Sequence, residues 1–147
     1  MENDPSSMLS LVADARSAVA DRLVTPWWYH PILGLLVAAY LVAYTFASTL
    51  WRALTVLAFL AAVALLARTY RAITGLWLWG TNAGRASRWA YAMGAVILIA
   101  MLASLLIATT TTLTWPTWGL AALTWATVIV LGRRFDAAVR AQLRAGA

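Results

Sequence analysis

Apolar residues fill long blocks of this chain and leave no polar face. Between Pro31 and Ala67 the only charged residue is Arg52, and between Trp89 and Gly132 there is none. A helix in water needs a polar stripe on its outer side, so blocks without one predict helices that cross a bilayer. We expect these helices at about residues 32–50, 53–67, 90–108 and 117–131. The second and fourth are somewhat short of the roughly 20 residues that span a hydrocarbon core.

The connections between the blocks predict the topology. A few residues around Trp51 separate the first two helices, and a short stretch around Pro116 separates the last two, so each pair should pack antiparallel. The sequence therefore predicts an all-α polytopic membrane protein, whose transmembrane domain (residues 27–132) holds four transmembrane helices as two antiparallel hairpins. Residues 68–89 would form an interfacial loop between the hairpins on the cytoplasmic side.

Both terminal segments predict short amphipathic helices. In residues 1–26, apolar side chains recur at helical spacing, which favours a surface helix, with a frayed tail as the alternative. Acidic residues in this segment are unlike the basic start of a cleaved leader, so we expect it to be retained. Residues 133–147 follow a helix end expected at Gly132, and there Asp136 stands four residues before Arg140. That spacing favours an ion pair along a basic helix suited to an anionic leaflet.

The composition supports a membrane protein rather than a nucleic-acid binder. Of the 147 residues 63% are hydrophobic and 11% are charged, with a mean hydropathy of +0.78, whereas soluble domains carry about 25% charged residues. The sequence pI near 10.8 comes from arginines that flank the apolar blocks, where anionic headgroups are the nearer partner, so we exclude nucleic acid. Every basic residue is arginine, and together with the abundant alanine this is typical of a GC-rich bacterial genome.

Arginine placement predicts the orientation. If both termini are inside, Arg52 is the one arginine outside, and all others lie in the N-terminal segment, the loop at 68–89 or the C-terminal segment. Short arginine-rich segments stay in the cytoplasm. We therefore expect a multi-pass protein of the cell (cytoplasmic) membrane with cytoplasmic N- and C-termini.

Small residues recur every four positions in three of the expected helices. Such a ridge lets a neighbouring helix approach closely. The candidate helix-packing residues are Ala39, Ala43, Ala47, Ala100, Ser104, Ala108, Ala122 and Ala126. Beside the first ridge, Tyr40 and Tyr44 are candidate intramembrane polar residues. Their hydroxyls would bond to a facing helix or, alternatively, mark a polar track for a substrate.

Arginine and tryptophan gather at the expected cytoplasmic interface. Indole rings with a polar edge and guanidinium groups on apolar stems both suit the headgroup region. The candidate partner or lipid interface residues are Arg68, Arg71, Trp77, Trp79, Arg85, Arg88, Trp89, Arg133 and Arg134. His30 is the only histidine and stands in a proline- and tryptophan-rich stretch, where we expect a solvent-exposed interfacial side chain.

The chemistry that the sequence lacks narrows the function. There is no cysteine, which excludes disulfides, thiolate nucleophiles and cysteine-ligated metals. No Asp, Glu, Lys or His lies inside the four expected spans, where proton-coupled exporters and aspartate-based membrane proteases place their working groups. The scattered glycines match no phosphate-binding motif. We therefore expect no catalytic residue, no cofactor and no metal.

Two functions remain after these exclusions. The first is a non-catalytic integral membrane protein, an assembly or accessory subunit that acts through helix–helix and interfacial contacts. Its protein partner would be another copy of the chain or a larger membrane protein. The second is a pore-forming, holin-like protein or a transport protein, for which the small size, the basic C-terminal segment and the Tyr40–Tyr44 stripe are the support. In both, the lipid bilayer with its anionic inner leaflet is a partner.

Overall fold

A computed structural model describes residues 8–12, 14, 25–74 and 83–145 of the chain. Its long elements are helices: α2 (Tyr29–Phe46), α3 (Thr49–Thr74), α4 (Ser87–Thr110) and α5 (Trp115–Ala145), with a short 3₁₀ helix, η2 (Gly84–Ala86), before α4. All four are long and apolar enough to span a membrane, as the sequence predicts. Residues 8–12 and 14 are also helical, and the rest of the predicted N-terminal amphipathic helix lies outside the described residues.

The helices extend beyond the predicted spans. α3 continues past Ala67 to Thr74, and α5 continues through Gly132 to Ala145, so the separate C-terminal helix expected at 133–147 is the last part of α5. The prediction that Gly132 ends a helix was wrong, because the alanine, arginine, glutamine and leucine residues after it favour helix strongly. The 31 residues of α5 measure about 46 Å, which exceeds a hydrocarbon core of about 30 Å.

The first turn also lies earlier than predicted. α2 ends at Phe46, and Ala47 has extended backbone angles (φ −76°, ψ 144°), so it belongs to the turn and not to a helical ridge. Trp51 and Arg52, expected in the turn, lie in the first turn of α3. The Arg52 Nε donates to the Tyr44 carbonyl oxygen at 3.3 Å. This bond satisfies one of the carbonyls that the end of α2 leaves unpaired.

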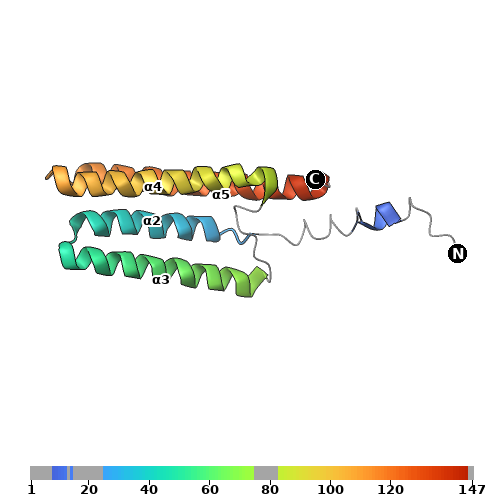
Figure 1. Cartoon of the computed structure of the whole chain (residues 1–147), viewed down its shortest axis with the longest axis horizontal. Coiled ribbons are helices and arrows are strands. Elements are labelled where there is room, and N and C mark those ends of the chain that lie inside the picture. The colour runs from blue at the N-terminus through green and yellow to red at the C-terminus, as the bar shows by residue number, and fades with distance from the viewer. Residues whose placement is uncertain (1–7, 13, 15–24, 75–82, 146–147) are drawn as a thin grey trace.

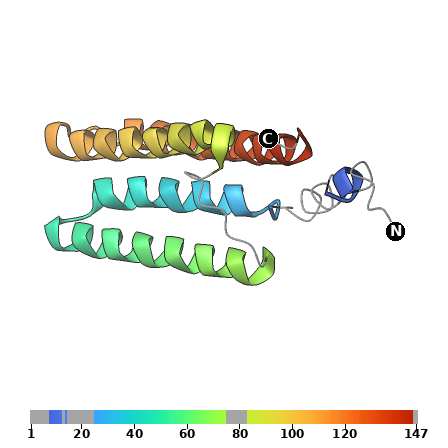
Figure 2. The same ribbon diagram turned by 45° about the vertical axis from the view of Figure 1, so that its right-hand side comes forward.

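The helices lie alongside one another with α2 in the middle (Figures 1 and 2). α4 and α5 run together on one side of α2, and α3 lies on the other side in both views. α2 packs most extensively against α5, and α5 also packs against α4 and η2. α3 has an extensive contact with α2 alone. The result is a core of three helices, α2, α4 and α5, with α3 attached to one side.

The core lies where α2 meets α4 and α5. Val37 and Leu41 of α2 are fully buried, and Ala100 of α4 is 3% exposed. The buried positions of α2 are three or four residues apart, as one face of a helix requires. They are His30, Gly34, Val37 and Leu41. The inner face of α2 is therefore a stripe that starts with a histidine.

Two glycines allow α2 and α5 to approach closely. A Cβ on Gly34 of α2 would lie 3.0 Å from Trp125 Cδ1 and 3.1 Å from the Trp125 carbonyl oxygen. A Cβ on Gly132 of α5 would lie 2.5 Å from the Cγ of His30. Larger side chains at either position would separate the helices. The tight pair is thus built on glycine and not on the alanine ridges that the sequence suggested.

A hydroxyl pair links α4 to α2 inside the core. Ser104 is fully buried, and its Oγ lies 3.1 Å from the Leu41 carbonyl oxygen and 3.0 Å from the Thr45 Oγ1. The Thr45 Oγ1 lies 2.8 Å from the same carbonyl. A buried hydroxyl needs such partners because hydrocarbon offers none.

Candidate functional site

The arginine-rich ends of the helices meet at one end of the bundle. The ring of Tyr29, at the start of α2, lies 4.8 Å from the ring of Tyr70, near the end of α3. The Ala86 N–H of η2 donates to Gln142 Oε1, near the end of α5, at 3.1 Å. We call this region the basic end, and its described arginines are Arg68, Arg71, Arg85, Arg88, Arg133, Arg134, Arg140 and Arg144.

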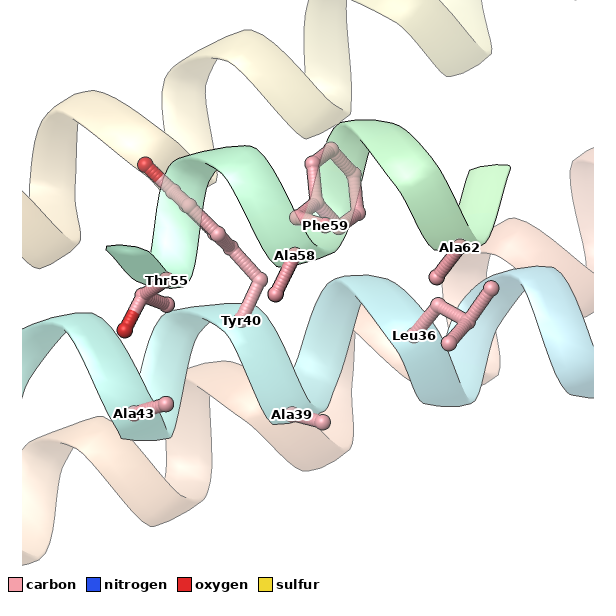
Figure 3. Close-up of a pocket in the computed structure, with 8 residues that line it drawn as sticks. All are labelled: Leu36, Ala39, Tyr40, Ala43, Thr55, Ala58, Phe59 and Ala62. Carbon is pink, nitrogen blue, oxygen red and sulfur yellow. The ribbon is translucent and has the colours of Figure 1, made fainter. Parts of the chain in front are cut away.

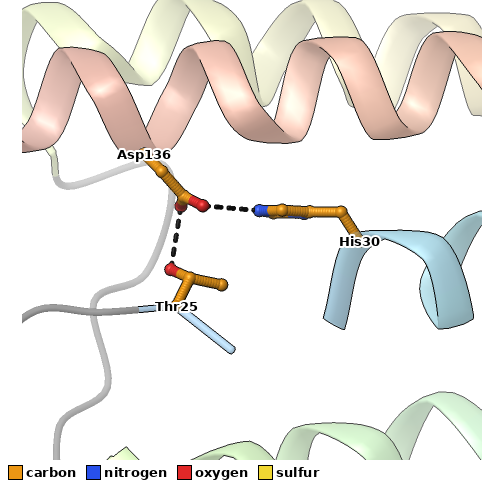
Figure 4. A network of polar contacts seen from close by, with 3 residues as sticks. All are labelled: Thr25, His30 and Asp136. Atoms are coloured by element: carbon orange, nitrogen blue, oxygen red, sulfur yellow. Dashed lines mark hydrogen bonds and ion pairs between the residues drawn. The ribbon is translucent and has the colours of Figure 1, made fainter. Parts of the chain in front are cut away.

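A partly buried polar network at the basic end joins the start of α2 to α5 (Figure 4). His30 Nε2 lies 2.8 Å from Asp136 Oδ2, and Thr25 Oγ1 donates to Asp136 Oδ1 at 3.0 Å. An ionised carboxylate only accepts hydrogen bonds, so Nε2 carries the proton of this bond. His30 is 6% exposed, which overturns the expectation of a solvent-exposed side chain. The carboxylate reaches across to α2, whereas the sequence favoured a pair with Arg140 on its own helix.

Gly132 makes the room that the His30 ring occupies. A Cβ at this position would collide with Nδ1 and lie 2.6 Å from Cε1. Nδ1 is buried and has no hydrogen-bond partner among the residues that the structure describes. The Nε2 of the ring is therefore hydrogen-bonded to Asp136, and Nδ1 is packed against Gly132. The histidine, the glycine and the aspartate form one unit whose members depend on one another.

The His30–Asp136 pair shows that the helices hold ionisable groups, although the four predicted spans do not. α2 and α5 extend beyond the predicted spans, so His30 is the second residue of α2, and Asp136 lies in the last third of α5. Among the described residues there is no group of three or more His, Cys, Asp or Glu side chains that could hold a metal.

A pocket of about 360 Å³ opens beside this network. Arg133 and Arg140 stand three residues before and four residues after Asp136, which places the three on one face of α5. The indole of Trp27, 83% exposed, stands at the pocket as well. The lining residues are Thr25, Pro26, Trp27, His30, Arg133, Asp136 and Arg140. The pocket therefore combines two cations with a carboxylate whose oxygens are both already hydrogen-bonded.

η2 fastens the start of α4 to the end of α5. Gly84 has a positive φ of 56°, which favours glycine, and a Cβ there would lie 3.1 Å from Gln142 Nε2. The Ala83 N–H donates to Ser87 Oγ at 3.1 Å, which closes the turn before α4. With the Ala86–Gln142 bond, these contacts hold η2 and the start of α4 against the end of α5.

The predicted interface arginines all lie at the surface. Arg68, Arg71, Arg85, Arg88, Arg133 and Arg134 are exposed. Two of them hold one indole from different helices, because the guanidinium carbons of Arg88 and Arg134 lie 5.3 and 5.6 Å from the ring of Trp89. Both distances are within the range of a cation–π contact. Trp77 and Trp79 lie outside the described residues.

Two apolar grooves flank α2 away from the basic end. One, of about 290 Å³, lies between α2 and α3 (Figure 3), and the other, of about 470 Å³, lies between α2 and α5. Ala39 and Ala43 line both grooves and are exposed, so they are not in the buried helix contact that the sequence predicted. We call the surface around Ala39 and Ala43, between α3 and α5, the open face of α2.

The other predicted packing residues are divided between inner and outer faces. Ala100 and Ser104 are buried on α4, and Ala108 is half-buried. Ala122 and Ala126 are exposed on α5, and Ala122 lines the groove beside α2. The buried residues of α5 are Thr117, Ala121, Thr124, Val128, Gly132 and Val139. A spacing of four is the same on every face of a helix, so it could not distinguish Ala121 from Ala122.

Tyr40 and Tyr44 lie at the contact between α2 and α3. The ring of Tyr40 is 4.9 Å from Phe59 and 5.5 Å from Tyr44. The guanidinium of Arg52 lies 5.5 Å from the ring of Tyr44. These contacts account for the two tyrosines as packing side chains, and they join α2 to α3.

Sequence reasoning missed the network at the basic end. A lone histidine carries no spacing signal, and its partner is 106 residues away. The signal that existed was the coincidence of one histidine and one acid at matching ends of two apolar blocks. No protein-family model, curated protein or solved structure matches this chain.

Proposed function

We propose that this chain is a small non-catalytic integral membrane protein, an assembly or accessory subunit that binds another membrane protein or a second copy of itself. The open face of α2 carries this proposal. Its floor is Ala39 and Ala43, and the side chains beside it are much larger, with Phe59 on α3 and Trp125 on α5. Small side chains at the floor let a further helix approach closely and gain dispersion contacts.

A helix fits such a face better than lipid does. An acyl chain loses conformational freedom when it is held in a groove, whereas a helix is already ordered and has less to lose. The two grooves share one floor, so one helix lying along α2 would contact the walls from α3 and from α5. Packing of this kind is what drives helix association where the hydrophobic effect is absent.

The loose attachment of α3 supports the same proposal. α3 has 26 residues, and only Leu66 among them is buried. Its outer surface carries large apolar side chains such as Leu57 and Leu65, which are 62% and 67% exposed. A partner on the open face of α2 would also contact α3 and hold it from a second side.

The proposed location is the cell membrane of a bacterium, with the basic end and both termini in the cytoplasm. Arg52 lies near the start of α3, at the opposite end of that helix from Arg68 and Arg71. The excess of arginine at one end supports this orientation through the positive-inside tendency. A reporter fused after Ala147 should be active only in the cytoplasm, and activity outside would contradict the orientation.

A pore has less support as the function. The described core is filled by Val37, Leu41 and Ala100, so a conduit would have to form between chains. Controlled expression with a potential-sensitive dye separates the two functions. An accessory subunit leaves the membrane potential unchanged, whereas a holin-like protein collapses it.

Cross-linking in native membranes, followed by mass spectrometry, tests the accessory function. We expect one partner, or a second copy, to be cross-linked to the wild-type chain and to be lost in Ala43→Leu. Ala95→Leu is the matched control, because Ala95 is an exposed alanine of α4 and lies outside both grooves. A wild-type chain that yields only monomer, with no co-purifying protein, would refute the proposal.

A further inference from the structure

We propose that the pocket beside His30 and Asp136 binds the phosphodiester group of an anionic phospholipid from the leaflet that surrounds the basic end. The inference rests on the proposed membrane location but not on the proposed protein partner. Its basis is the charge of this pocket, the wall that the hydrogen-bonded network gives it, and its position beside the start of α2.

The charge of the pocket favours an anion. Arg133 and Arg140 both line it, and Asp136 is the only acidic residue in the sequence after Asp21. The two oxygens of that carboxylate accept hydrogen bonds from Thr25 and His30, which turn it toward α2. Two guanidinium groups therefore share one carboxylate that is already engaged. A phosphodiester would restore the balance with charge-assisted hydrogen bonds.

The network gives the pocket a fixed wall. The Thr25 hydroxyl is bonded to Asp136, so the segment before α2 is held against α5. His30 is buried against Gly132, and its ring is part of the pocket lining. Sites that are ordered before binding lose less freedom on binding than mobile arginines at a surface.

The position of the pocket points to a lipid as the source of the phosphate group. Pro26 and the exposed indole of Trp27 stand at the pocket, directly before the apolar α2. Indole rings gather at the level of lipid headgroups, and the apolar helix next to them suits acyl chains. A lipid anchored in the same leaflet also meets the pocket at a high local concentration, which a free anion does not.

Native mass spectrometry of the full-length protein in mild detergent measures this binding directly. Phosphatidylglycerol is the probe, phosphatidylcholine the comparison lipid and inorganic phosphate the competitor. We expect one phosphatidylglycerol to bind more tightly than phosphatidylcholine and to resist excess inorganic phosphate. Arg133→Gln/Arg140→Gln should weaken that binding about tenfold or more, the loss expected for charge-assisted hydrogen bonds.

Arg134→Gln/Arg144→Gln is the matched control, because it removes the same charge from the same helix but from residues outside the pocket. Equal loss in both double variants, or equal binding of the two lipids, would overturn the proposal in favour of diffuse attraction. Complete displacement by inorganic phosphate would overturn the lipid as the source.

Circular dichroism checks that each variant is folded. If the glutamine variant does not fold, Arg133→Lys/Arg140→Lys keeps the charge but loses the planar forks, and it should bind more weakly than wild type. Unchanged affinity in a folded lysine variant would count against specific hydrogen bonds. The number of bound lipids is measured for each oligomeric species separately. A chain that stays monomeric and binds no other protein would therefore contradict the proposed accessory function and leave the lipid-binding measurement valid.

Discussion

α5 and α3 are both long apolar helices with two or more arginines in their C-terminal part, yet they contribute differently to the bundle. α5 buries residues from Thr117 to Val139 and packs against α2, α4 and η2. α3 buries only Leu66 and packs extensively against α2 alone. Hydropathy does not explain this difference, because both helices are apolar enough to cross a membrane and the more apolar one, α3 (mean hydropathy 2.2 against 1.2), is the less buried. The difference comes from where small and polar residues lie on the helix surface.

Close approach decides which helix is central. α5 meets α2 at Gly34 and Gly132, and at Gly132 the space is filled by His30, which also forms a hydrogen bond with Asp136. α3 meets α2 through the rings of Tyr40 and Phe59, which hold the two backbones apart and leave a groove beside them. Two different features of the sequence are therefore at work. The hydropathy of a helix decides whether it can span a membrane, and the positions of its small and polar residues decide whether it packs in the core.

The largest expected effect comes from Gly132. Gly132→Ala places a methyl group where His30 lies, so the ring must move and the pair with Asp136 is lost. We expect the free energy of unfolding to fall by about 3 kcal/mol, the range for overpacking and for breaking a buried pair. Thermal unfolding in detergent, followed by circular dichroism, measures this. Gly94→Ala is the control, since no atom lies within 4 Å of a Cβ there, and equal losses in both variants would refute the role of Gly132.

A double-mutant cycle measures how strongly His30 and Asp136 stabilise each other. His30→Gln, Asp136→Asn and the double variant should show a coupling free energy of about 1–2 kcal/mol, because the bond is charge-assisted and shielded from water. The readout is again thermal unfolding in detergent. Additive losses in the double variant would mean that the two residues act independently, and that α5 owes its central place to shape alone.

Buried and exposed hydroxyls should differ by a smaller amount. Ser104→Ala removes a core hydroxyl that bridges α4 and α2, and we expect a loss of roughly 0.6–1.5 kcal/mol. Thr55→Ala on α3 removes a hydroxyl that only bonds to the Trp51 carbonyl of its own helix, so stability should not change. Equal effects would show that α3 is held as firmly as the core.

The smallest effect on the isolated chain is expected at the open face. Ala43→Leu should change the unfolding free energy of the detergent-solubilised monomer by less than about 0.5 kcal/mol, as exposed substitutions usually do. The same variant in native membranes should lose its cross-linked partner. A large loss of stability in the monomer would mean that α2 is packed on this side as well, and the contrast between α3 and α5 would fail.

The chain pattern predicted the four spanning helices, but not their ends. The apolar blocks were clear because Arg52 alone interrupts them. The helix ends depend on local capping and propensity, and for this reason the predictions that Gly132 ends a helix and that Ala47 lies within one were wrong. The site was harder to predict than the fold. His30 and Asp136 meet only because α2 and α5 lie together, and nothing local to either residue carries that information.

α2 and α5, the two helices with the most extensive contact, are the first and the last of the four long helices along the chain. During synthesis α2 and α3 leave the ribosome first, and the inner stripe of α2 has no partner until α4 and α5 follow. His30 must stay hydrated near the membrane surface until Asp136 has been translated. The contact between α2 and α5 can therefore form only when synthesis of the chain is almost complete. A chain truncated within α5 would then insert but not close, which would expose it to quality-control proteases.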